Sequence, residues 1–183
     1  MDAERRLKDV AQGTIRTGRI SLTPLTVADA DEMAEVLSDP GLYRFTGGSP
    51  PSAADLRVTY RRQLTGPADG HEVWRNWIIR SEPGGQPVGY VQATIAADWH
   101  TAELAWVIGA RWQRLGYATA AAQAVADWLR ACGVGELRAH IHPGHEASAR
   151  VAARLGLRPT GTMRDGEQLW ISEAAAAGSA DDG

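Results

Sequence analysis

The sequence predicts an α/β protein whose mixed central sheet of about six to seven strands is flanked by about four helices. Segments with an apolar residue at every second position, the period of a strand, alternate with segments of helical spacing. Their order along the chain is β-α-α-β-β-β-α-β-α-β-β. Short turns join three consecutive strands in the middle, which makes these strands antiparallel neighbours. A mixed sheet therefore fits the pattern better than a uniformly parallel one.

The individual elements follow from alternation, helix caps and turn residues. Thr26 with Asp29, and Ser52 with Asp55, are the spaced pairs that begin helices. Prolines and glycines at residues 40–51 indicate a long loop between these two helices. The expected strands cover residues 18–25, 72–80, 87–97, 102–109, 135–142, 158–164 and 167–172. The expected helices cover residues 26–40, 52–64, the later part of 110–129, and 145–157.

Chain length sets the expected domain organisation. A chain of 183 residues is long enough to bury a core, and we expect a single domain over residues 19–172. Residues 1–18 form a charged lead-in with little pattern, and residues 173–183 form a tail without an apolar face. Both segments are expected to be poorly ordered.

Charge and cysteine content exclude several functions. The net charge of −3 and the pI of about 5.9 argue against a general nucleic-acid binder, which carries a basic stripe. Cys132 is the only cysteine, so an internal disulfide and a thiolate-rich metal site are excluded. No apolar run approaches the length of a membrane span, and the first residues lack the apolar stretch of a signal peptide. We expect a cytoplasmic protein without membrane or nucleic-acid partners.

Residues 113–118, QRLGYA, lie between an expected strand and an expected helix. Main-chain N–H groups at a helix N-terminus, together with the helix dipole, bind anions well. Gly116 and the small Ala118 let the backbone come close to an anion, and Arg114 can add a charge-assisted hydrogen bond. The turn therefore predicts an anion site.

These six residues resemble the Q/R-x-x-G-x-G/A signature of the GCN5-related N-acetyltransferases (GNATs). The later stretch HPGHEASARVAARLGLRPTG is similar to the family segment H-P-x-N-x-A-S-x-x-V-A-x-x-L-G-F. The opening RISLTPLTVADADEMAEVLSDP is similar to the first strand and helix of the RimJ/RimL-like branch. The resemblance covers about residues 19–171. It implies the GNAT fold, acetyl-CoA as co-substrate without a metal, and acetyl transfer to a primary amine.

The resemblance also implies which residues bind acetyl-CoA. Its pyrophosphate would lie on the QRLGYA turn, and main-chain N–H groups near Val107 and Ile108 would face the thioester carbonyl and the pantetheine arm. His145 occupies the position of the family's Asn, and an imidazole can replace only one of the hydrogen bonds of that amide. The expected cofactor-binding residues are Trp106, Val107, Ile108, Gln113, Arg114, Leu115, Gly116, Tyr117, Ala118, Thr119 and His145.

Three residues are expected to carry the chemistry. Many GNATs use a Tyr as general acid on the helix before the x-x-L-G turn, but this position is Ala152 here. In the RimJ/RimL-like branch a Ser earlier on this helix is proposed instead, and Ser148 matches it. Glu167 in the closing hairpin and Glu103 on the cofactor strand are the candidate bases, with Glu167 preferred because its branch also supplies Ser148. A carboxylate with a pKa of about 4.3 needs burial or a water relay for this role.

The acceptor pocket is expected to come from residues 42–51, residues 64–74 and the closing hairpin. Tyr43, Arg44 and Phe45 are the expected substrate contacts. The resemblance favours a protein N-terminal amine, and an antibiotic-like or metabolite amine is the alternative, because a fold does not determine a substrate. A homodimer is possible, since exposed strand edges in this branch often pair.

Two other interpretations stay open. His140, His142 and His145 could bind zinc, but the family often has a His here without a metal, so we expect His142 to cap its strand and His140 to pack or face solvent. The chain could also bind acetyl-CoA without turnover, as a sensor, because the catalytic Tyr is missing. A Rossmann enzyme is not indicated, because no G-x-G-x-x-G follows the first strand.

Overall fold

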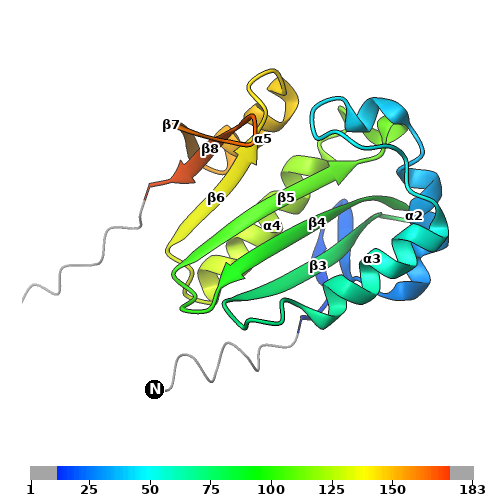
Figure 1. Cartoon of the computed structure of the whole chain (residues 1–183). Helices are drawn as coiled ribbons and strands as arrows, with labels where there is room; N and C mark the ends of the chain where they lie inside the picture. Colours follow the sequence, from blue (N-terminus) through cyan, green and yellow to red (C-terminus); the bar gives the residue numbers. More distant parts are fainter. Residues whose placement is uncertain (1–11, 174–183) are drawn as a thin grey trace, which may run out of the picture.

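The computed structural model describes residues 12–173 and shows one sheet with helices on both of its faces (Figure 1). In this part of the chain the strands are β1 (Ile15–Thr17), β2 (Ile20–Pro24), β3 (Glu72–Ser81), β4 (Pro87–Ala96), β5 (Thr101–Ile108), β6 (Glu136–Ile141), β7 (Leu157–Arg164) and β8 (Glu167–Ser172). The α-helices are α2 (Ala30–Val36), α3 (Ala53–Thr65), α4 (Tyr117–Ala131) and α5 (Glu146–Arg154). The 3-10 turns are η1 (Val27–Asp29), η2 (Pro40–Tyr43) and η3 (Ala110–Trp112). Among residues 12–173, no helix combines the length and the apolar character needed to cross a membrane.

The strand order in the sheet is β1-β2-β3-β4-β5-β6-β8-β7, and every neighbouring pair is antiparallel except the parallel pair of β5 and β6. The predicted mixed sheet flanked by four helices is confirmed. The expected six to seven strands were too few, because residues 15–17 of the expected lead-in pair with β2. Three residues are too short to show a periodic pattern. Most of the lead-in and the tail, at residues 1–11 and 174–183, lie outside the described residues.

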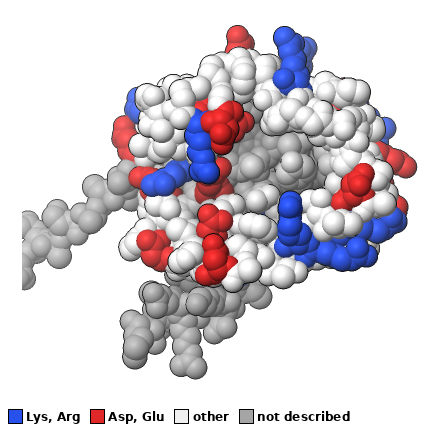
Figure 2. Space-filling model, in the orientation of Figure 1, with Lys and Arg blue, Asp and Glu red and all other residues white. Residues whose placement is uncertain are grey.

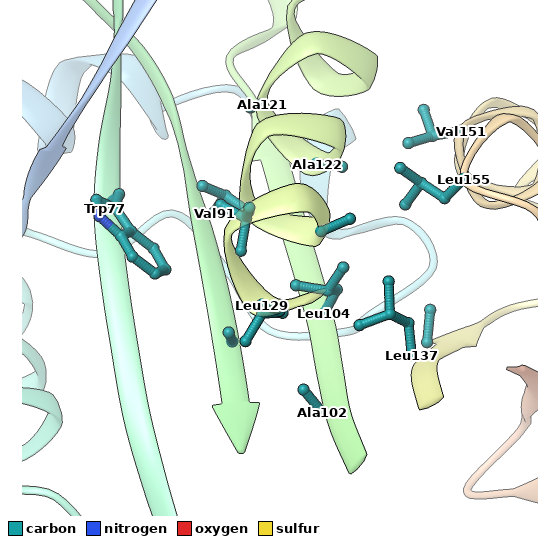
Figure 3. Close-up of a cluster of buried hydrophobic side chains, with 14 of the residues drawn as sticks. Trp77, Val91, Ala102, Leu104, Ala121, Ala122, Leu129, Leu137, Val151 and Leu155 are labelled. Atoms are coloured by element: carbon teal, nitrogen blue, oxygen red, sulfur yellow. The ribbon is translucent and has the colours of Figure 1, made fainter. Parts of the chain in front are cut away.

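Helices α4 and α5 cover one face of the sheet. The buried positions of α4 are mostly alanines, and small side chains let a helix axis lie close to the strands. Figure 3 shows Leu129 of α4 among Val91, Leu104 and Leu137 from three strands, and Leu155, which follows α5, belongs to the same cluster. Each buried side chain of this kind contributes roughly 1.5–3 kcal/mol. This packing fixes the position of α4, and with it the position of its N-terminus.

Helices α2 and α3 cover the other face, over β2, β3 and β4. Ser52 and Asp55 form the predicted capping box of α3. The predicted box of Thr26 and Asp29 is also present, but it begins the 3-10 turn η1. Helix α2 ends at Val36, earlier than the expected residue 40. A residue before proline disfavours helical backbone, and Asp39 accepts a hydrogen bond from the N–H of Gly41 instead, at 2.7 Å.

The sheet divides between β5 and β6. Register pairs join the two strands only from Thr101 to Glu103, and no described residue of β5 after Glu103 pairs with β6. β6 continues to pair with β8 as far as Ile141, so the two strands diverge, as Figure 1 shows. Ala105 is exposed although β5 is a central strand. We call the diverging segments, 104–108 of β5 and 139–141 of β6, the fork.

Candidate active site

The turn at residues 113–119 follows β5 at the open end of the fork. Arg114 and Gly116 have positive φ angles of 64° and 83°. This conformation suits glycine, whereas another residue in it costs about 1–3 kcal/mol. Among the described residues, no side chain caps the N-terminus of α4, although Ser52 caps α3 and His145 caps α5. The turn is exposed as far as Gly116. The first N–H groups of α4 are therefore open to an anion, so this site fits the pyrophosphate that the sequence predicts.

Two arginines that sequence reasoning missed lie beside this turn. The guanidinium carbon of Arg19 lies 5.7 Å from the ring centroid of Tyr117. Its Nη1 atom would lie 3.7 Å from a Cβ placed on Gly116. Arg154, on α5, donates a hydrogen bond to Oγ1 of Thr119 at 3.3 Å. Both side chains add positive charge around the N-terminus of α4.

The end of β5 is attached to the turn and packed closely against β4. Nε2 of Gln113 donates to the carbonyl oxygen of Ile108 at 3.1 Å, so this predicted cofactor-binding side chain is used within the protein. Gly89 of β4 is the register partner of Ile108. A Cβ on Gly89 would overlap the carbonyl oxygen of Val107 and lie 3.0 Å from the Cα of Ile108. The backbone position of the predicted thioester strand therefore depends on a glycine in its neighbour.

Ser148 and His145 form a hydrogen-bonded pair at the start of α5. Nδ1 of His145 accepts the main-chain N–H of Ser148 at 3.3 Å, so a neutral ring carries its proton on Nε2. Oγ of Ser148 lies 3.4 Å from that Nε2 and can accept from it, which leaves the hydroxyl hydrogen free for another acceptor. Burial lowers the pKa of His145, and the neighbouring His142 lowers it further, which favours the neutral ring.

The loop after α2 reaches the start of α5 through Phe45. The ring centroid of Phe45 lies 5.1 Å from that of His142 and 4.7 Å from that of His145. Arg44 is exposed, with its guanidinium carbon 5.4 Å from the centroid of Phe45. The structure thus places one predicted substrate residue, Phe45, against the predicted cofactor residue His145, and a second, Arg44, against Phe45.

Tyr43, the third predicted substrate residue, lines a cavity of about 230 Å³. We call it the α3 cavity, because α3, the loop after α2 and strands β3 and β4 surround it. The hydroxyl of Tyr43 donates to the carbonyl oxygen of Leu37 at 2.9 Å, which fixes the loop wall. Tyr90 also lines the cavity, and its register partner in β5 is Val107. The cavity therefore adjoins the strand at which the thioester is expected.

Glu103 and His140 meet where β5 and β6 begin to diverge. Oε1 of Glu103 lies 3.0 Å from Nδ1 of His140, and the side chain of His140 is only 17% exposed. His140 therefore packs inside the protein, which is one of the two expected outcomes, and it also contacts a carboxylate. The two side chains form an ion pair when the imidazole is protonated.

In the stretch HIHPGH, the Nδ1 atoms of the three histidines each contact a different partner. His142 accepts the N–H of Gly144 at 3.0 Å, His145 accepts from Ser148, and His140 faces Glu103. Within residues 12–173, no group of three or more His, Cys, Asp or Glu side chains is placed to hold a metal ion.

The remaining predicted residues lie in two places. Glu167 is the first residue of β8, and the next residue, Gln168, pairs with Ile141 at the end of β6. None of residues 64–74 lines the α3 cavity, although Gln63 does. The expected contribution of residues 64–74 to the acceptor pocket stays a prediction.

The divided sheet, with an uncapped helix N-terminus at its open end, has a shape that would fit an extended, anionic ligand. The family model of the acetyltransferase (GNAT) domain matches residues 19–158. The chain belongs to the GNAT acetyltransferase family, and it is an acetyltransferase. None of the curated proteins compared matches the chain.

Solved structures share this fold at low sequence identity. The GNAT-family acetyltransferase from Bacillus anthracis has a TM-score of 0.72 at 19% identity, over 86% of this chain and 95% of that chain. RimL, the ribosomal L7/L12 alpha-N-protein acetyltransferase in complex with coenzyme A, has a TM-score of 0.73 at 14% identity, over 86% and 96%. AAC(6')-Ib in complex with ribostamycin and coenzyme A has a TM-score of 0.68 at 19% identity, over 84% and 92%.

Proposed function

We propose that this acetyltransferase transfers the acetyl group of acetyl-CoA to a primary amine, either a protein N-terminal amine or a small-molecule amine. The fork is the observation that carries the proposal. It opens a central strand beside an uncapped helix N-terminus, and the α3 cavity adjoins the same strand. The amine acceptors in the names of similar structures, an alpha-N-protein in RimL and ribostamycin in AAC(6')-Ib, support an amine.

The donor side of the site uses main-chain groups and arginines. The N–H groups at the start of α4 would hold the pyrophosphate of acetyl-CoA, and Arg19 and Arg154 would add charge-assisted hydrogen bonds to its phosphates. Main-chain N–H groups near Val107 and Ile108 would stabilise the oxyanion, an effect of about 3–4 kcal/mol in other enzymes.

The acceptor amine would attack the thioester carbonyl carbon. A C–N bond forms and the C–S bond breaks, so one proton must leave the nitrogen and one must reach the departing thiolate. Ser148 is the proposed acid, because His145 directs its hydrogen bond to Oγ and leaves the hydroxyl hydrogen free. Ala152, the family's Tyr position, is fully buried and offers no proton.

Glu103 with His140 is the proposed proton acceptor. The pair lies at the base of the fork, on the sheet face that also holds the α3 cavity. Val107 lies four positions after Glu103, about 13 Å along a strand, so water must carry the proton between them. Glu167 is the alternative base. Measuring kcat/KM as a function of pH for Glu103→Gln and Glu167→Gln distinguishes the two candidate bases. The variant that lacks the base loses the rise of kcat/KM with pH.

An acceptor screen tests the proposed function. The purified protein is incubated with acetyl-CoA and a panel of peptides, polyamines, aminoglycosides and simple amines, and acetylated products are detected by mass. We expect amide products from at least one class. Acetyl-CoA binding without any transfer would instead support the sensor function, which the missing Tyr at position 152 favours. The expected homodimer stays a prediction that analytical ultracentrifugation can test.

A further inference from the structure

The α3 cavity is lined by uncharged side chains only. Its twelve lining residues include three tyrosines, Tyr43, Tyr60 and Tyr90, and its amides are Gln63 and Asn76. None of the twelve is Asp, Glu, Lys, Arg or His. Figure 2 shows acidic and basic side chains at several places on the face shown, with uncharged surface between them.

One polar group in this wall has no partner. Tyr60 is 5% exposed, and its hydroxyl has no hydrogen-bond partner among residues 12–173. A buried hydroxyl without a partner is costly, so a ligand that hydrogen-bonds to it is favoured. Burial also raises the pKa of Tyr60, and it raises that of Tyr90 to about 12, so both phenols stay neutral at physiological pH.

Charge and size together restrict the acceptor. A second ammonium group of the ligand would lie in a partly dehydrated cavity whose uncharged wall offers no carboxylate. Such an unpaired buried charge is strongly disfavoured. Cavities for drug-sized ligands measure about 300–1,000 Å³, whereas this cavity measures about 230 Å³. It has room for one ring or branched group and not for several linked sugar rings.

Building on the proposed acetyl transfer, we infer that the acceptor is a monoamine. Its amine is attached to one uncharged apolar group, and this group carries a polar atom that can hydrogen-bond to the hydroxyl of Tyr60. Polyamines and aminosugars are poor acceptors. The chemistry is shared by a free arylalkylamine and by a peptide whose first side chain is an uncharged ring, so the test includes both. The apolar group would occupy the α3 cavity, where the lining residue Tyr90 is the register partner of Val107 and brings the cavity wall to the expected thioester strand.

The test measures kcat/KM with tyramine, phenethylamine, an uncharged tetrapeptide beginning with Tyr, spermidine and kanamycin. We expect tyramine or the peptide to exceed spermidine and kanamycin by about 10-fold or more. The ranking of the free amine and the peptide identifies the natural source. Higher kcat/KM for either polycation overturns the inference and leaves the proposed function intact. No product from any amine, with acetyl-CoA still bound, overturns both.

Two variants connect the preference to the cavity. Tyr60→Phe should lower the preference for tyramine over phenethylamine by about 5-fold and leave acetyl-CoA affinity unchanged. Gln63→Glu places a carboxylate in the wall and should raise kcat/KM for spermidine relative to phenethylamine by about 10-fold. Gln123→Glu adds the same charge on α4, behind the sheet, and should not change the ratio. Thermal unfolding confirms that each variant is folded. Unchanged ratios in both cavity variants would overturn the inference.

Discussion

Replacing Gly89 by alanine should damage the site without touching any polar group. The new Cβ would overlap the carbonyl oxygen of Val107 and lie 3.0 Å from the Cα of Ile108, and both atoms belong to the backbone of β5. A backbone cannot rotate away as a side chain does, so the end of β5 must move by about 1 Å. Forced overpacking costs roughly 1–3 kcal/mol, and a 1 Å displacement of reacting groups can cost about 100-fold in rate.

Thermal unfolding and steady-state kinetics measure these two effects. For a chain of this size, we expect Gly89→Ala to lower Tm by about 2–12 °C and kcat/KM for the acceptor by about 100-fold. Gly161→Ala is the matched control, because a Cβ at Gly161 meets no atom within 4 Å and its φ is not in the left-handed region. If Gly89→Ala lowers Tm but keeps the wild-type kcat/KM, the assignment of β5 as the thioester strand is refuted.

Three further variants test other parts of the site. Ser148→Ala should lower kcat by about 100-fold and leave acetyl-CoA affinity unchanged by calorimetry, whereas wild-type kcat would remove its role as the acid. Arg19→Met should weaken acetyl-CoA binding by about 5- to 10-fold and reduce its salt dependence; equal affinity and salt dependence would exclude phosphate contact. Because burial lowers the pKa of His145, the unfolded chain binds a proton below pH 6.5 that the folded chain does not. The free energy of unfolding should therefore fall as pH drops below 6.5, and urea unfolding should show a smaller fall in His145→Asn; equal falls would contradict this.

Local patterns in the sequence predicted most of the fold. The capping pairs at Thr26 and Ser52 use contacts three residues apart, so they can be read directly from the chain. The turn before α4 was also predictable, because Gly116 with its positive φ lies between a strand and a helix. Strand β1 left no signal, because it has three residues and depends on pairing with β2.

The parts of the site that sequence reasoning missed depend on contacts between distant segments. Arg19, near the first of the described residues, lies beside Gly116, which is far from it in the sequence. Glu103 meets His140 only because β5 and β6 run parallel in one register. Nothing near Gly89 in sequence distinguishes it from any other glycine in a strand. Its importance appears only when the carbonyl oxygen of Val107 is placed beside it.

The fork creates a sheet edge in the interior of the sheet, and this edge limits the shape of what can enter. Free strand edges normally attract another polypeptide strand, which needs about 4.8 Å of spacing on each side. β5 and β6 are still joined at Thr101–Glu103, so the gap narrows to nothing at its base. A second polypeptide strand that paired with β5 in this gap would therefore have to stop at Thr101–Glu103. This limit on its length protects the exposed backbone from extended strand pairing.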